Sequence, residues 1–341
     1  MTQAVRMIAL PIVRRLATAA GTLAGVAVVV FVLLRIVPGD PVAMMISPGA
    51  SASDIAALRA HYGLDGSILS QFWVWLRSML SGDLGVSISL RRSVGEVLLE
   101  RLPATLELCM AALEFAVLVG GLVALIGTIW RNSWVEELID ALTGLLLAVP
   151  DFIWALALAL ILGVLWPVLP LSGRLDPSNS SGMATPFFWA ESLLRLRIDT
   201  FADLTRHLIM PVLALGLPLA AVIARVLKGA LIEAMAQDYV LLAQLKGMSR
   251  LRLVLQEALG NALAPTLALT GVQFTFLVGG TVITERIFAF PGIGNMAVDA
   301  VINRDLPLIQ GLVLVFAVIF IAVNMLVDLL QLVFNPRLRH G

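Results

Sequence analysis

The segment DYVLLAQLKGMSRLRLVLQEALGNALAP, residues 238–265, is polar and basic and lies between two long apolar stretches. Hydrocarbon solvates the charges of Lys246, Arg250 and Arg252 poorly, so these side chains are expected outside the bilayer core. A helical segment of this length is more than a connector between two membrane spans requires. The segment therefore predicts a docking element for another protein, on a chain whose flanking stretches cross a membrane.

The composition places the whole chain in the same class. Of its 341 residues, 60% are hydrophobic and 13% are charged, which lies outside the range of soluble domains. The formal net charge is +0, whereas a nucleic-acid partner would require a basic face. We therefore expect an all-α polytopic membrane protein that binds no nucleic acid. The one cysteine, Cys109, lies in an apolar run and is expected to pack as a small hydrophobic residue.

Six apolar stretches are long enough, at about 20 residues, to cross the hydrocarbon as helices. The first is longer than the core of a signal peptide, and no cleavage pattern follows it, so we interpret it as a retained span. The predicted spans are residues 16–37, 105–129, 138–166, 208–227, 263–283 and 306–334.

Six spans would place both termini on one side, together with Arg131 and the 228–260 segment. The short segments on that side carry Lys and Arg with few acids, so the positive-inside rule predicts that it is cytoplasmic. The longer loops opposite also contain arginines, but acids are interleaved with them, and there the rule is weaker. The expected parts of the chain are residues 1–37 with the first span, an external segment 38–104, a transmembrane core 105–334 and a cytoplasmic tail 335–341.

Two external segments are long enough to carry structure. Residues 70–80 predict an amphipathic helix, and its Phe72, Trp73 and Trp75 are expected in the lipid headgroup layer, with contact to a soluble partner as the alternative. Residues 171–206 contain prolines and a Ser-Asn-Ser-Ser-Gly run, which predict an irregular external loop.

Motifs for a bound nucleotide or metal are missing from the sequence. No glycine-rich loop ends in Lys-Ser or Lys-Thr, and the three histidines lack the spacing of a metal site. Gly292 and Gly294 follow no strand, so they predict a tight turn or re-entrant loop at the outer end of the fifth span. We therefore expect no catalytic residue, cofactor or metal on this chain, and energy supplied by a partner.

Ionisable residues inside spans are costly and are therefore candidates for the translocation pathway. Glu107 and Glu114 share a face of the second span at a distance of two helical turns. Asp328 shares a face of the sixth span with Asn324, one turn earlier. Asp151 follows a proline, where the helix is expected to bend. For all four carboxylates the alternative role is interhelical hydrogen bonding that stabilises the bundle.

The 238–265 segment resembles the cytoplasmic Glu-Ala-Ala signature of ATP-binding-cassette (ABC) importer permeases. More narrowly, the chain looks like the first of the two permeases in dipeptide, oligopeptide and nickel importers. Marks of this family occur in order along nearly the whole length, and their order and spacing make them specific together. They are PGDP at 38–41, YGLD at 62–65, GDLG at 82–85, LPATLEL at 102–108, TERIF at 284–288, FPGIG at 290–294 and NPR at 335–337.

The resemblance implies a type I ABC importer architecture with a coupling helix at about residues 236–249. The chain departs from the family at Leu241 and Gln244, where arginines are common, and at Glu257, where a histidine is common, so the charge of its docking face differs. Asp151 replaces a residue that is usually small and polar, and a carboxylate there favours a cationic substrate or the amino end of a peptide. The residues expected to couple to an ATPase are Asp238, Tyr239, Ala243, Lys246, Gly247, Glu257, Asn261 and Pro265. The external turn or gate is expected at Glu285, Phe288, Phe290, Pro291, Gly292 and Gly294.

The resemblance also implies partners in a bacterial cytoplasmic (inner) membrane. They are a second homologous permease forming a heterodimer, two cytoplasmic ATPase subunits that hold ATP and Mg, and a periplasmic or lipid-anchored substrate-binding protein. ATP binding would close the ATPases and turn the spans from inward-facing to outward-facing. Short peptides are the expected substrates, with nickel, glutathione or another small solute as the alternative within the family. From another class, an ion-coupled secondary transporter is the alternative, although no internal repeat of that kind is visible.

Overall fold

The structure, a computed structural model, describes residues 15, 17–32, 66–179 and 183–334. In these residues the backbone is helical with turns and loops, and the one strand-like pairing is an isolated bridge between Val86 and Ser93. The predicted all-α class is confirmed. The chain divides into two compact units, the first formed by Met1–Leu102 with Met296–Ile321 and the second by Pro103–Asn295 with Ala322–Gly341.

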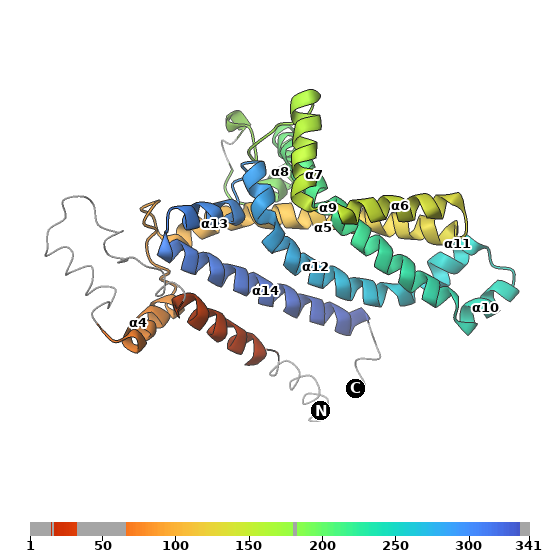
Figure 1. Cartoon of the computed structure of the whole chain (residues 1–341), viewed down its shortest axis with the longest axis horizontal. Helices are drawn as coiled ribbons and strands as arrows, with labels where there is room; N and C mark the ends of the chain where they lie inside the picture. Colours follow the sequence, from red (N-terminus) through yellow and green to blue (C-terminus); the bar gives the residue numbers. More distant parts are fainter. Residues whose placement is uncertain (1–14, 16, 33–65, 180–182, 335–341) are drawn as a thin grey trace. The chain divides into compact units, whose positions relative to one another are not determined.

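Unit 1 contains short apolar helices and the ends of longer ones (Figure 1). A helix over Ala17–Val32 is followed by α4 (Ile68–Leu80), where Ser67 caps the N-terminus through its hydroxyl. This confirms the amphipathic helix predicted at 70–80. The ring of the buried Phe31 lies 5.3 Å from that of Phe72 and 5.6 Å from that of Trp75. These two aromatics therefore pack on a neighbouring helix, whereas Trp73 is 60% exposed.

A buried carboxylate holds the loop that carries the Gly-Asp-Leu-Gly mark. The Ser87 and Ser89 hydroxyls donate to Asp305 Oδ2 at 2.6 and 2.7 Å, and the Ser89 N–H donates to the same oxygen at 2.9 Å. Although burial raises the pKa of the Asp305 carboxyl, these hydrogen bonds outweigh it and hold that pKa below its ordinary value. Asp305 directly precedes α14 (Leu306–Phe334), so the loop is fixed to the start of that helix.

Unit 2 is arranged around α9 (Ile198–Met235), the most buried of its long helices. It packs against α6 (Trp134–Ala148), α7 (Asp151–Leu158), α8 (Phe188–Leu194) and α12 (Leu259–Ile287). Unit 2 also contains the π-helical η1 (Ala159–Leu165), η2 (Pro177–Asn179), α10 (Asp238–Leu245), α11 (Arg250–Arg252), the π-helical η3 (Leu253–Ala258) and most of α5 (Val94–Ile129) (Figure 1). Most of α13 (Ile293–Ile302) belongs to unit 1.

Among the described residues, four helices are long and apolar enough to cross a membrane, namely Val94–Ile129, Ile198–Met235, Arg250–Ile287 and Leu306–Val327. The third predicted span, 138–166, is instead a pair of helices bent by 96° between Trp134–Ala148 and Asp151–Leu165. Val149 has extended backbone angles, as a residue before proline prefers, so the predicted bend is a full break. The first predicted span, 16–37, lies partly outside the described residues, and the count of six stays a prediction.

The predicted irregular loop at 171–206 is wrong in two places, because α8 lies within it and α9 already begins at Ile198. The buried Glu191 organises this region, since its carboxylate accepts the Ala184 N–H at 2.8 Å and both the N–H and the hydroxyl of Thr185 at 2.7 and 2.6 Å. These donors, with Arg195 nearby, lower the pKa of Glu191 to about 2. These contacts join residues only six and seven positions apart, but hydrophobic periodicity does not reveal them.

Candidate functional site: docking segment, outer turn and membrane charges

The docking segment folds as a short helix with one buried and one exposed apolar side. In α10, Val240 and Ala243 pack against Leu253, with Met235 and Met248 at the edge of the cluster. The opposite side remains open although it is apolar, with exposed fractions of 53% for Leu241, 55% for Leu242 and 78% for Leu245. A solvated helix does not gain from such a side, so it fits a surface that another protein covers.

Gly247 ends α10 by its backbone conformation. Its φ is +85°, a left-handed angle that glycine adopts without cost, and its N–H donates to the Gln244 carbonyl at 2.9 Å. Nothing lies within 4 Å of the position that a Cβ would occupy. The glycine is therefore required by the turn and not by a close neighbour in this chain. The adjacent Lys246 is exposed and forms no ion pair with the described residues.

A side-chain hydrogen bond joins α10 to α12. The Asn261 amide donates to the Tyr239 hydroxyl at 2.6 Å, and Pro265 follows one turn later inside the same helix. Glu257 lies half-buried in η3, while Asp238 is exposed in the first turn of α10. The structure therefore brings Tyr239 and Asn261 together and buries Ala243, whereas Asp238 and Lys246 are exposed.

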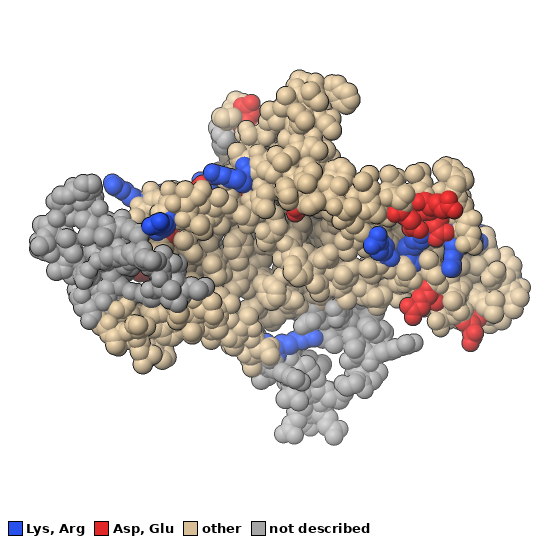
Figure 2. All heavy atoms as spheres, in the orientation of Figure 1, with Lys and Arg blue, Asp and Glu red and all other residues tan. Residues whose placement is uncertain are grey.

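A hollow with a volume of about 290 Å³ lies beside this segment, where α5, α9 and α10 approach each other. Arg131 and Arg250 line it, and Arg250 donates to the Thr128 carbonyl at 3.1 Å. On the face shown in Figure 2, acidic and basic side chains gather over the end of unit 2 that carries α6, α10 and α11. Charged side chains are therefore exposed beside the docking segment on this face.

The predicted outer turn is built around the fully buried Glu285 at the end of α12. Its carboxylate accepts the Thr105 hydroxyl at 2.6 Å and the Asn295 N–H at 2.8 Å. The Thr105 hydroxyl oxygen accepts the Ile293 N–H at 2.9 Å. This network fixes the turn to α5, because Thr105 lies on that helix.

The glycines of the same turn make room for the Glu285 carboxylate. A Cβ at Gly292 would collide with it, and one at Gly294 would lie 3.0 Å from its Oε2 and 2.8 Å from the Val282 Cα. The chain reverses at Ala289, whose φ is +45°, and the Phe290 N–H donates to the Glu285 carbonyl at 2.8 Å. The expectation of a tight turn is met by this geometry. Two of its aromatic residues, Phe288 and Phe290, are buried, and Pro291 is half-buried.

Glu107 is fully engaged inside unit 2. It forms a buried ion pair with Arg174 and accepts the Trp189 N–H at 2.9 Å. Arg174 also donates to the Pro186 carbonyl and lies 4.3 Å over the Phe188 ring. Burial lowers the pKa of the Arg174 guanidinium, and the Glu107 carboxylate opposes that shift. These contacts favour the stabilising alternative for Glu107.

The other predicted pathway carboxylates differ in their surroundings. Glu114 is exposed on α5 and makes no contact of this kind with the described residues. Asp151 begins α7, accepts the Phe152 N–H at 2.8 Å and places its other oxygen 3.5 Å from the Cβ position of Gly280 on α12. Asp328 belongs to α14, but its side chain lies outside the described part of the structure. Among the described side chains, those of Glu107, Glu114 and Asp151 do not form one cluster.

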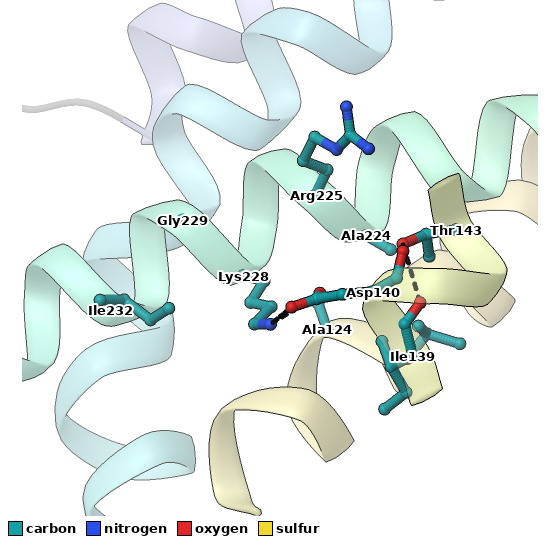
Figure 3. A pocket seen from close by; sticks show the side chains of 10 residues that line it. Ala124, Ile139, Asp140, Thr143, Ala224, Arg225, Lys228, Gly229 and Ile232 are labelled. Carbon is teal, nitrogen blue, oxygen red and sulfur yellow. Dashed lines mark hydrogen bonds and ion pairs between the residues drawn. The ribbon is translucent and has the colours of Figure 1, made fainter. Parts of the chain in front are cut away.

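A set of charged side chains lies between α6 and α9 that was not predicted from the sequence. Lys228 Nζ donates to the two Asp140 oxygens at 2.8 and 2.9 Å and lies 2.8 Å from Glu136 Oε1. We call Glu136, Asp140 and Lys228 the α6–α9 charge cluster. It borders a cavity of about 310 Å³ that Arg225 also lines (Figure 3). The available signal was the i,i+3 spacing of Arg225 and Lys228 directly after the uncharged run 208–224 of α9.

These features define a membrane-embedded helical subunit with a docking helix in its larger unit. Among the described residues no group of three or more His, Cys, Asp or Glu side chains forms a metal site. The exposed apolar side of α10 is a candidate surface for contact with another protein.

Comparison with known proteins identifies the family. The chain belongs to the binding-protein-dependent transport system inner membrane components, whose family model matches residues 116–340, while the model of the N-terminal part of such membrane components matches residues 7–109. Members are the multi-pass permease subunits of ABC importers and not their ATPases. The chain is therefore a translocation subunit that works in a membrane with partner ATPases and a substrate-binding protein.

Several relatives align over 96% of this chain and 98% of their own length. The di/tripeptide transport system permease protein DppB of Pseudomonas aeruginosa is 38% identical over 330 residues. The dipeptide transport system permease protein DppB of Escherichia coli is 36% identical over 335 residues. The glutathione transport system permease protein GsiC of Salmonella paratyphi A is 34% identical over 329 residues.

A solved structure of the MetNI methionine ABC transporter in inward-facing conformations shares the fold. The match has a TM-score of 0.55 at 14% identity and covers 70% of this chain and 96% of that chain. It supports the type I permease architecture for the core.

Proposed function

We propose that this chain is the first of two permeases in an importer of di- and oligopeptides. The observation that carries the proposal is the near full-length similarity to permeases named for dipeptide and di/tripeptide transport. Glutathione is itself a tripeptide derivative, and the similarity to a glutathione permease over the same length makes it the second candidate substrate.

The proposed complex contains a second, homologous permease, two cytoplasmic ATPases that hold ATP and Mg, and an external binding protein. In this arrangement α10 docks on one ATPase, so α10 and both termini lie in the cytoplasm. The exposed side of α10 with Leu241, Leu242 and Leu245 supplies apolar contact area, and Lys246 supplies a positive charge for an acidic partner group. Residues 38–104 and the loop before α9 then lie outside, facing the binding protein.

The path of coupling follows α12. At one end this helix is tied to the docking segment through Asn261 and Tyr239, and at the other it carries Glu285 and the outer turn. A continuous helix transmits a displacement of one end as a rigid-body motion. We therefore assign α12 as the element through which closure of the ATPases reaches the external turn.

The experiment that tests this proposal has two steps. The first step purifies the tagged chain from its native membrane in mild detergent and identifies each co-purifying protein by mass. Recovery of a second permease and ATPases supports the importer, whereas recovery of the chain alone, under conditions that keep known complexes intact, favours the secondary transporter. In the second step the complex in proteoliposomes is given labelled dipeptide, tripeptide, glutathione or Ni²⁺ with the binding protein. ATP-dependent uptake of a solute other than a peptide would reject the proposed substrate class.

A further inference from the structure

Arg225 is a charged residue that directly follows a long uncharged run of α9. Residues 208–224 contain no charged side chain, and α9 is long and apolar enough to cross a membrane. Arg225 is exposed and makes no hydrogen bond or ion pair with the described residues. Charged groups in membrane helices generally have a partner or a function, so Arg225 is a candidate for binding a ligand.

Lys228, one turn further, does not compete for that ligand. Its ammonium already has two carboxylates within 2.9 Å, those of Asp140 and Glu136. The α6–α9 charge cluster therefore carries a net charge of −1, and the Asp140 side chain is 59% exposed. The cavity thus presents a cation, Arg225, and an acceptor that has access to solvent, Asp140.

The position of the cavity along the helices matches the boundary of the hydrocarbon. The uncharged run 208–224 is roughly 25 Å long at 1.5 Å per residue, close to the thickness of the bilayer core. Trp130 directly follows α5 and Trp134 begins α6, and they are 51% and 73% exposed. Both helices contribute to the lining of the same cavity. Tryptophans of this kind mark the headgroup level of a membrane.

The cavity is lined by both apolar and charged side chains. Val123, Ile139 and Ile232 contribute aliphatic surface, while Arg225 and Asp140 contribute charge. In Figure 3 Lys228 and Asp140 point toward each other between α6 and α9, while the Arg225 side chain extends from α9 away from that pair. These residues line one hollow of about 310 Å³ between α5, α6 and α9. A molecule with a charged head and an apolar body matches a lining that has both kinds of side chain. A guanidinium is well suited to bind a phosphodiester by two hydrogen bonds.

From these observations we infer that the cavity is a binding site for a membrane phospholipid headgroup. Arg225 binds the phosphodiester, and the exposed side of Asp140 accepts a headgroup ammonium, which selects phosphatidylethanolamine over phosphatidylglycerol. The site requires the membrane placement of the chain but not its transport of peptides. A lipid bound there would join α9, the helix that leads into the docking segment, to α6.

The test measures bound lipid on the purified importer complex by native mass spectrometry. The complex is delipidated in detergent and exposed to an equimolar mixture of dioleoyl phosphatidylethanolamine, phosphatidylglycerol and phosphatidylcholine. We expect retained phosphatidylethanolamine in the wild type and about a tenfold loss of its affinity in Arg225→Gln, as for a lost charge-assisted interaction. Arg206→Gln is the matched control, because Arg206 is exposed at the other end of α9 and has no partner among the described residues.

Two further variants protect the test against misfolding and identify the headgroup. Arg225→Lys keeps the charge without the two-pronged geometry and should retain an intermediate amount of lipid. Asp140→Asn should reduce the preference for phosphatidylethanolamine over phosphatidylglycerol while keeping the bound phosphate. Equal lipid retention in Arg225→Gln and wild type overturns the site, as does displacement of the lipid by substrate peptide, which would assign Arg225 to the cargo. Transport activity enters none of these readouts, so failure of the proposed function would be seen separately.

Discussion

Gly247 determines the direction of the chain after the docking helix, because its φ of +85° is a conformation that other residues avoid. Replacing it with valine should strain the turn by about 1–2 kcal/mol and displace Lys246 and Tyr239 from the ATPase, while the bundle stays folded. We expect ATP hydrolysis to continue in proteoliposomes while peptide uptake falls.

Gly82→Val is the matched control for this prediction. Gly82 has a φ of +86° and equally open surroundings, but it lies in unit 1. The control should suffer similar backbone strain and keep its ratio of uptake to ATP hydrolysis. Normal peptide uptake by the Gly247→Val complex would show that Gly247 has no role in coupling.

At the outer turn the decisive contact is between a glycine and a buried carboxylate. Gly292→Ala would place a methyl group against Glu285, and overpacking of this kind costs about 1–3 kcal/mol. The thermal unfolding temperature of the purified chain should fall. Gly279→Ala on α12, the helix that carries Glu285, has nothing within 4 Å of its Cβ position and should leave the unfolding temperature unchanged or raise it. Combining Gly292→Ala with Glu285→Ala should give a smaller loss than the sum of the two, since the methyl group then has room.

At the scale of elements, α8 depends on the ionised form of Glu191. Hydrogen bonds from Ala184 and Thr185 lower its pKa to about 2, from 4.5 when unfolded. The stabilisation is therefore fully present above about pH 4.5 and is lost as the pH falls toward 2. Hydrogen exchange in residues 184–195, corrected for the intrinsic pH dependence, should accelerate in that window. Glu191→Gln should show fast exchange already at pH 7, and unchanged exchange in both experiments would contradict the assignment.

The bounds of a long apolar helix could be predicted from the sequence, whereas contacts between distant residues could not. The helix predicted at 306–334 is α14 with the same bounds, because an uninterrupted apolar run has no competing signal. The bend at Pro150 was expected, but its 96° angle depends on how α7 packs against α9 and α12. The charge cluster and the Glu285 network were not predicted, because their members are far apart in sequence and only packing brings them together.

For the whole molecule, the proposed function depends on which side of the membrane each loop faces. Docking on a cytoplasmic ATPase requires Lys246 inside and the loop with Ser178 outside, and both residues are exposed. The single native cysteine, Cys109, is buried, so Cys109→Ala gives a background without thiols. In intact cells a membrane-impermeant maleimide should label Ser178→Cys and not Lys246→Cys, whereas inside-out vesicles should show the reverse. Cells permeabilised with detergent should label both, which controls for reactivity. The opposite pattern would place α10 on the outer face, where no ATPase can reach it, and would exclude coupling through this helix.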